Sequence, residues 1–318
     1  MAKKIIILFS LISSINVFSQ DAGDAKVTRP MLNGHKFVVN NFVSSPFVNT
    51  FFRNTLGFGQ AVDLNVPILY IDGEPVAGLR GDISFLTVDF EYQYAINNWA
   101  GIFGKIGLLT RFGTEAQSLV AQGLNASYGM ELGWLFNVYK SKKVVISLTA
   151  NLWNKSGTVL DLYDFVKEII DSSGLTEDNN LLYSHDYVQG GGGIRMAWAP
   201  KSYLGVNGLF ELAYGESIDN VMKNELYYKL GLSVDYDIRA HNPDVPLGFS
   251  LGAVLDSFAR SDDSAVDDNS IVIFFRTAYT GRDDLLISFD MDWSRLPLST
   301  VSERLKTMTG LITIEYYF

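Results

Sequence analysis

The sequence predicts an all-β protein, a single antiparallel transmembrane β-barrel of about 12 strands, and two observations carry this prediction. From about residue 47 onward, apolar and polar residues alternate in segments of roughly 10 to 15 residues, which are long enough for membrane-spanning strands of about 9–11 residues. The charged residues of each segment also stay on one side of that alternation. A barrel in lipid must be apolar outside and is free to be polar inside, so both observations fit it.

The expected strands are even in number, as in bacterial barrels whose two ends lie on the same side of the membrane. Short connections follow every second segment, and longer ones, including 156–184 and the acidic 261–269, follow the others. Short turns and both termini are therefore expected in the periplasm, with the long loops outside. The strands are expected, in order, at 47–60, 82–95, 99–113, 124–140, 143–155, 185–199, 201–215, 225–239, 247–260, 269–281, 284–293 and 307–318.

The strongest test of the barrel is parity, that is, which alternate residues of a strand share a face. In 82–95, Leu86 and Phe90 share one face, while Asp89 and Glu91 share the other. A soluble β-sandwich also alternates, but it would carry its charges on the outer faces and would need a second sheet to cover its core. The remaining segments repeat the pattern, so the charges are expected to point into the barrel.

The N-terminus has the pattern of a secretory signal peptide over residues 1–19. Two lysines precede a mostly apolar stretch over 5–18, and Val17 and Ser19 occupy the −3 and −1 positions of a cleavage site. The apolar stretch is short for a membrane span, although an uncleaved anchor is the alternative. We expect three parts: the signal peptide at 1–19, a periplasmic N-terminal segment or plug at 20–46, and the barrel at 47–318.

Composition narrows the chemistry. The chain has no cysteine, so disulfides, a lipoprotein anchor and thiol-bound metals are excluded. Removal of the signal peptide would leave 23 basic and 35 acidic residues, a formal charge of −12. A field of that sign argues against a nucleic-acid partner. No cofactor is expected.

The chain ends in a strand pattern that alternates to its last residue. In 311–318, Ile312, Ile314, Tyr316 and Phe318 share one face. Together with the leader and the alternating strands, this ending resembles Gram-negative outer-membrane β-barrel proteins, and the leader and the many aromatic residues look like Bacteroidetes sequences. The resemblance implies an outer-membrane location, contact with outer-membrane lipid, and Tyr316 and Phe318 as part of the signal read by the barrel assembly machinery. It identifies no protein partner and no functional residue.

The inward charges are the candidate functional residues. They would line a wet conduit or pair into a solid plug of salt bridges, and a barrel of this size allows either. A tight turn near residues 97–99 would place Glu91 opposite Lys105. The candidates are Asp89, Glu91, Lys105, Arg111, Glu131, Arg195, Glu211, Lys229, Asp235, Arg276, Asp290 and Glu315.

Two segments break the strand pattern. Residues 158–171 place apolar side chains at helical spacing, which predicts an amphipathic helix in an extracellular loop, packed on its neighbours or acting as a lid. The run Gly190–Gly193 lacks the lysine of a phosphate loop, and it predicts strong barrel curvature or close approach of another backbone.

Catalysis and metal binding have little support. The chain holds only three histidines, and the neighbours of His185, Ser184 and Asp186, would point to the opposite face of a strand from it. The acidic loop at 261–269 lacks the spacing and the glycine of an EF-hand, so a solvated loop is favoured over a metal site. We expect a protein that is not an enzyme.

The sequence favours a passive channel or transporter for small polar or cationic solutes, the cation preference coming from the acidic outer loops. One alternative is a structural or partner-binding barrel with a plugged lumen. A second is a barrel that releases hydrophobic molecules through a lateral opening, for which a break in strand pairing near Gly190–Gly193 would be evidence.

Overall fold

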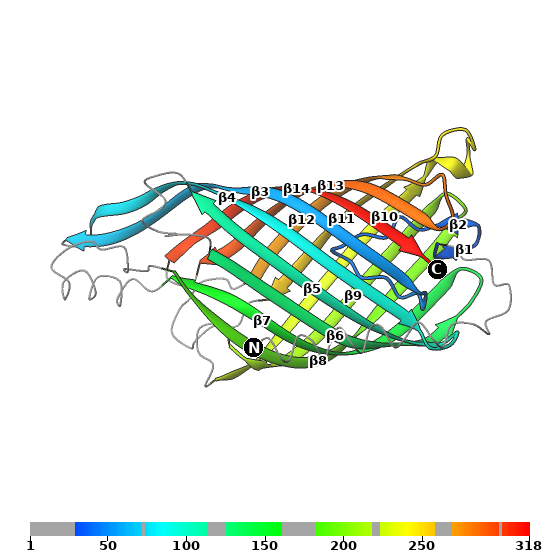
Figure 1. Cartoon of the computed structure of the whole chain (residues 1–318), viewed down its shortest axis with the longest axis horizontal. Helices are drawn as coiled ribbons and strands as arrows, with labels where there is room; N and C mark the ends of the chain where they lie inside the picture. The colour runs from blue at the N-terminus through cyan, green and yellow to red at the C-terminus, as the bar shows by residue number, and fades with distance from the viewer. Residues whose placement is uncertain are drawn as a thin grey trace.

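The computed structural model describes residues 29–71, 74–113, 125–160, 182–217, 223–257, 269–298 and 301–318, and the predicted signal peptide lies outside them. Twelve antiparallel strands close into one barrel, as predicted (Figure 1). They are β3 (Phe51–Ile71), β4 (Glu74–Ala95), β5 (Ala100–Gly113), β6 (Asn125–Lys140), β7 (Val144–Leu160), β8 (Leu182–Lys201), β9 (Leu204–Glu216), β10 (Asn224–Asp237), β11 (Leu247–Ser257), β12 (Asn269–Tyr279), β13 (Leu285–Leu298) and β14 (Val301–Tyr317).

Each strand pairs with its neighbours along the chain, and the last strand closes the ring on the first. The β14–β3 pairing runs from Tyr317 opposite Phe51 to Lys306 opposite Val62. This closure leaves no free sheet edge in the barrel, so its backbone hydrogen bonds are satisfied within the ring, as a lipid environment requires.

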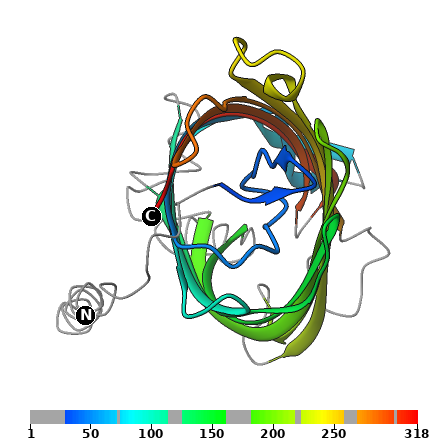
Figure 2. The ribbon, with the colours of Figure 1, turned by 90° about the vertical axis from the view of Figure 1, so that its right-hand side faces the viewer.

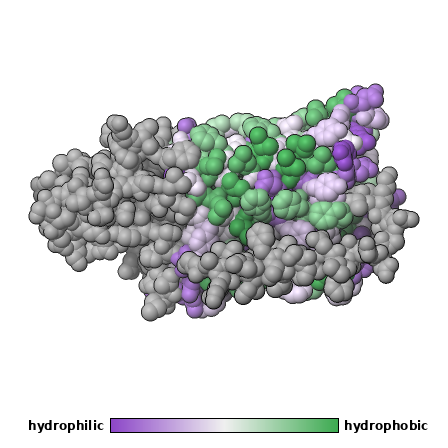
Figure 3. Space-filling model, in the orientation of Figure 1, coloured by the Kyte–Doolittle hydropathy of each residue, from purple (hydrophilic) through white to green (hydrophobic). Residues whose placement is uncertain are grey.

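The outward face is apolar along the barrel, and the predicted parity is confirmed. Leu132 of β6 is 61 % exposed and Ile312 of β14 is 54 % exposed, whereas the inward Glu315 is fully buried. Figure 3 shows hydrophobic side chains spread over the described strands, with hydrophilic ones gathered toward the end that carries the short turns. A surface of this extent and character is suited to lipid hydrocarbon.

Several strands are longer than the sequence pattern indicated. The connection expected over 61–81 is mostly paired strand, because β3 and β4 continue as a hairpin to Ile71 and Glu74, with irregular register at three places. Pro67 and Pro75, together with Gly78 and Gly81, interrupt the alternation there and conceal the strands.

The prediction of a helix over 158–171 is wrong for its first three residues. Residues 158–160 belong to β7 and pair with β8, from Thr158 opposite Ser184 to Leu160 opposite Leu182. Thr158 and Val159 are β-branched residues that favour strands. The rest of the predicted helix lies outside the described residues. Within the described ranges, the one helical element is the short 3-10 turn η2 (Ile238–Ala240), and none of them holds a helix long and apolar enough to cross a membrane.

The chain before the barrel lies inside it. Residues 29–50 pass within the ring of strands at the end that carries the C-terminus (Figure 2). They begin with a two-residue hairpin, β1 (Met31–Leu32) and β2 (His35–Lys36), whose turn residues Asn33 and Gly34 both have positive φ. Asn-Gly is the pair best suited to that turn. We call residues 29–50 the inner segment.

The inner segment extends further than the boundary at residue 46 suggested, because the first barrel strand starts at Phe51. Phe47 packs with Phe37 in a buried cluster inside the ring. Gln93 of β4 donates from its side-chain amide to the carbonyls of Phe47 and Asn49, both at 2.8 Å. These bonds hold the backbone of 47–49 away from strand pairing.

The glycine run in β8 is a place of close backbone approach. Pairing is unbroken on both sides, from Gly190 opposite Leu152 to Gly193 opposite Thr149, and with β9 from Gly190 opposite Tyr214 to Gly193 opposite Glu211. A Cβ at Gly191 would meet the carbonyl oxygen of Leu212 and would lie 2.7 Å from the Cα of Ala213. The run therefore allows neighbouring strands to bend tightly together.

Candidate functional site

The candidate site is a cavity of about 270 Å³ in the lumen of the barrel. It is bounded by inward side chains of β4 to β11 and, on one side, by Asn41 and Ser44 of the inner segment. Its charged lining residues are Asp89, Glu91, Lys105, Glu131, Lys155, Arg195, Glu211, Lys229 and Asp256, and its aromatic ones are Phe103, Trp153, Tyr187, Tyr227 and Tyr228.

The inward charges alternate in sign around part of the barrel. Following the strand register from β14 to β6, Glu315 lies opposite Arg53, Arg53 opposite Glu91, Glu91 opposite Lys105, and Lys105 opposite Glu131. The register predicted for Glu91 and Lys105 is therefore confirmed. Adjacent opposite charges favour this register over one that would juxtapose like charges.

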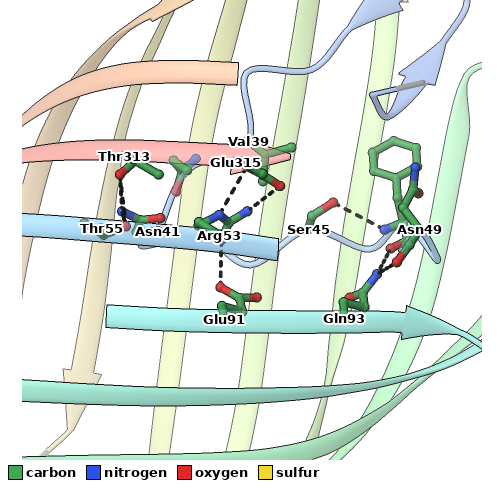
Figure 4. A network of polar contacts seen from close by, with 12 residues as sticks. Val39, Asn41, Ser45, Asn49, Arg53, Thr55, Glu91, Gln93, Thr313 and Glu315 are labelled. Carbon is green, nitrogen blue, oxygen red and sulfur yellow. Dashed lines mark hydrogen bonds and ion pairs between the residues drawn. The ribbon is translucent and has the colours of Figure 1, made fainter. Parts of the chain in front are cut away.

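The ion pairs within this row are not the ones that the register alone suggests. Arg53 donates two hydrogen bonds of 3.1 Å to the Glu315 carboxylate and one of 2.8 Å to Glu91 (Figure 4). Arg53 was not among the predicted residues, although its position between the outward Phe52 and Asn54 marked it as inward. Glu91 forms its ion pair with Arg53. No direct ion pair between Glu91 and Lys105 is present in the described part of the chain.

A second group of charges joins β6 to β9. Arg195 donates to Glu211 at 3.1 Å and lies 4.0 Å from Glu131. The amide of Asn151 donates to the same two carboxylates, at 3.0 Å to Glu131 and 3.4 Å to Glu211. The guanidinium of Arg195 also lies 4.8 Å from the ring centre of Phe103. Two carboxylates thus share one guanidinium and one amide.

Five charged side chains of the cavity are left without such partners. Within the described ranges, Lys105, Lys155 and Lys229 form no side-chain hydrogen bond or ion pair, and neither do the carboxylates of Asp89 and Asp256. The acidic neighbours of Lys105 are engaged by arginines, and Lys155 lies over the ring of Trp153 at 5.8 Å. These charges face the cavity, where they are available to a solute.

The other predicted lumen residues do not line the cavity, and all of them except Arg111 are buried near the inner segment. Arg276 pairs with Asp290, with 2.6 Å between Nη2 and Oδ2, and it also donates to the carbonyl of Val39. Asp235 accepts from Asn207 at 2.8 Å. All three charged residues, like Glu315, are fully buried. Arg111 is half-buried on β5 and is not among the cavity-lining residues.

Polar contacts hold the inner segment in the lumen. Asn41 donates to Thr55 at 3.0 Å and to Thr313 at 2.9 Å (Figure 4), and Asn40 donates to Ser233 at 3.2 Å. Ser147 donates to the carbonyl of Pro46 at 2.6 Å. The barrel thus binds this segment mainly through hydroxyl, amide and carbonyl groups.

The start of the inner segment is tied to the turn after β12. The backbone N–H of Arg29 donates to the carbonyl of Asp283 at 2.7 Å, and Lys36 pairs with the Asp283 carboxylate. The hydrogen bond from the Lys36 ammonium group holds the pKa of the Asp283 carboxyl below its usual value. His35 is fully buried beside Phe37, and burial lowers its pKa to about 4.

The described part of the chain assembles no metal centre. No group of three or more His, Asp or Glu side chains there is placed to hold a metal ion. His35 is inside the barrel. His241 lies in the turn after β10, with its ring centre 4.3 Å from that of Tyr203. The acidic residues 262–268 lie outside the described residues.

The last strand presents its aromatic residues as the parity predicts. Tyr316 and Phe318 point outward, where Phe318 stacks against Tyr92 at 6.2 Å, while Tyr317 points inward beside Phe51. Their exposure is compatible with recognition by the assembly machinery, which stays a prediction.

A closed antiparallel barrel with an apolar exterior and a charged interior has the architecture of transmembrane β-barrels. No protein-family model matches the chain, and no curated protein does. Among solved structures, it is similar to an outer-membrane channel from Pseudomonas putida F1, with 10 % identity, coverage of 89 % of this chain and 100 % of the other, and a TM-score of 0.52. It is also similar to the NanC porin, with 8 % identity, coverage of 84 % and 100 %, and a TM-score of 0.50. At these identities the likeness is one of fold.

Proposed function

We propose that the protein is a passive outer-membrane channel for small polar solutes. The observation that carries the proposal is the cavity, in which charged side chains that form no direct ion pair face open space inside a closed, lipid-compatible barrel. A purely structural barrel would be more stable with its inward charges directly paired, because burying a charge is costly unless it is paired and hydrogen-bonded. The shared fold with outer-membrane channels supports the same reading.

The inner segment is proposed to act as a plug at the periplasmic end. It places buried apolar residues such as Phe37 and Val38 inside the lumen and bonds to strands on several sides of the ring, at Ser233 of β10, Thr313 of β14 and Ser147 of β7. Most of these bonds are between neutral groups, each contributing about 0.5–1.5 kcal/mol. Water can replace such bonds. Release of Asn40 and Asn41 from the barrel therefore leaves no charged group without a partner.

The cation preference predicted from the acidic loops stays a prediction, because those residues lie outside the described ranges. The cavity itself carries both signs of charge. We therefore propose polar solutes as the class and derive no net charge preference from the cavity.

Single-channel conductance in a planar bilayer tests the proposal. Because the chain has no cysteine, Asn40→Cys with Ser233→Cys can be bridged by a short bis-methanethiosulfonate reagent, which forms a reducible disulfide with each thiol and releases methanesulfinate, to hold the plug in place. We expect lower conductance in the bridged form than after reduction, with Asn40→Cys alone as the matched control. Equal conductance in both forms would refute the plug.

A structural or partner-binding barrel is the second candidate, and the tight packing of the inner segment favours it. Absence of conductance in every form, including one that lacks residues 29–46, would replace the channel with this function. The third possibility, a lateral opening near Gly190–Gly193, loses support because strand pairing is continuous there and the neighbouring cavity is charged.

A further inference from the structure

The charges around the cavity are close to balanced. Five carboxylates and four cationic groups line it, one negative charge in excess. A solute that carries only one sign of charge would therefore meet as much repulsion as attraction in the cavity. A solute with both signs would find partners for both.

The two signs also lie next to each other. On β10, Lys229 is opposite Glu211 of β9 and opposite Asp256 of β11. On β5, Lys105 lies between Glu91 and Glu131 in the register. Cross-strand neighbours are about 4.5–5.5 Å apart at Cβ, so a cation and an anion are within reach of one small molecule at either position.

The position at Lys229 is the more available one. Asp256, directly opposite Lys229, has no side-chain hydrogen bond or ion pair among the described residues, whereas the two carboxylates directly opposite Lys105, Glu91 and Glu131, are already bound by arginines. Tyr227, two residues before Lys229 on the same face of β10, and Tyr187 of β8 supply an aromatic lining beside the charges. A solute at this point would meet an ammonium group, a carboxylate and apolar ring surface together.

The volume limits the size of the solute. A cavity of about 270 Å³ is slightly smaller than typical ligand sites of about 300–1,000 Å³. A cavity of this size suits a solute as small as an amino acid or a dipeptide.

We propose that the cavity is a binding site for small zwitterionic solutes of amino-acid or dipeptide size. Lys229 binds the solute carboxylate, and Asp256 binds its ammonium group. This inference rests on the proposed channel, since it names the class of solute that the lumen selects.

A series of four dipeptides that differ only in their end groups tests the charge requirement. They are glycylglycine, its N-acetyl form, its amide, and the form blocked at both ends, and binding is measured by calorimetry on the purified full-length protein in detergent. Each blocked end removes a charge-assisted hydrogen bond, so we expect a loss of affinity of about ten- to a hundredfold for each blocked end. Equal affinity for all four would overturn the proposal.

Two variants test which residue binds each end of the dipeptide. Lys229→Gln is expected to abolish the preference for a free carboxylate and to keep the preference for a free ammonium group. Asp256→Asn is expected to do the reverse. Lys142→Gln, in the exposed turn before β7, is the matched control and should change neither ratio. Retention of both preferences in both cavity variants would show that other residues bind the dipeptide.

Conductance of the same samples separates this inference from the proposed function. Ion conductance without dipeptide binding would refute the zwitterion site and leave the channel standing. Dipeptide binding without conductance in any form of the protein would uphold the site and refute the channel.

Discussion

Replacing Arg53 by methionine should destabilise the barrel strongly, because it leaves a fully buried carboxylate without a partner. Arg53 supplies three hydrogen bonds to Glu315 and Glu91, and the Glu315 side chain has no exposure of its own. Breaking one side of a buried ion pair costs about 3–5 kcal/mol, whereas neutralising both sides costs much less. We expect Arg53→Met to fall in that range and Arg53→Met with Glu315→Gln to be clearly more stable than Arg53→Met alone.

Unfolding by urea in lipid vesicles, followed by tryptophan fluorescence and by heat-modifiable gel mobility, measures these costs. Arg282→Met is the matched control, because Arg282 pairs with Asp284 on an exposed turn, where water and salt weaken the attraction, and it should change the stability little. A double variant that is as unstable as Arg53→Met would show that the buried charge of Glu315 is not the source of the loss. An unchanged Arg53→Met would refute the reasoning altogether.

Three further predictions concern the plug, the glycine run and the C-terminus. Lowering the pH from 7 to 4 should loosen the inner segment by up to about 3 kcal/mol, seen as faster proteolysis of 29–50 and higher conductance, and His35→Gln should flatten that response. Gly191→Ala should cost about 1–3 kcal/mol in urea unfolding, and Gly190→Ala, whose Cβ would meet nothing within 4 Å, should cost much less. Deletion of Phe318 should lower the yield of assembled barrel in membranes, and Phe318→Tyr should restore it.

The direction of the pH effect follows from where His35 binds its proton. In the docked segment, burial and the nearby charge of Arg29 hold the pKa of His35 at about 4, whereas a released segment titrates near the ordinary 6.5. The released form therefore takes up the proton first as the pH falls below 6.5, and docking weakens until about pH 4. Asp283, whose pKa is lowered by Lys36, acts in the same direction at lower pH. Tighter docking in acid would contradict this account.

The outward and inward faces were predictable because lipid enforces parity along every strand. The Glu91–Lys105 register was also predictable, since a short turn fixes a hairpin locally. The partner of Glu91 was not, because Arg53 faces it across the long β3–β4 hairpin, whose upper part the sequence pattern did not show as paired strand. The same arginine also binds Glu315 of β14 across the barrel closure, a contact between distant parts of the chain that no local pattern indicates.

The inner segment shows the same limit. Asn41 bonds to Thr313 across 272 residues, and Arg276 reaches Val39 across 237. Polar residues in 29–50 carry no alternation that would mark them as lumen-facing. The extended strands β3 and β4 were missed for a different reason, since prolines and glycines interrupt their pattern without ending the pairing.

The closure of β14 on β3 also constrains how the chain can fold. The inner segment directly precedes β3, and part of its binding surface, including Thr313, belongs to the last strand. Neither the ring nor its internal packing is complete until the final residues of the chain are available. Folding in the order of synthesis is therefore ruled out for this barrel, and contacts of such long sequence separation form slowly. Until then the unpaired strands are exposed to aggregation.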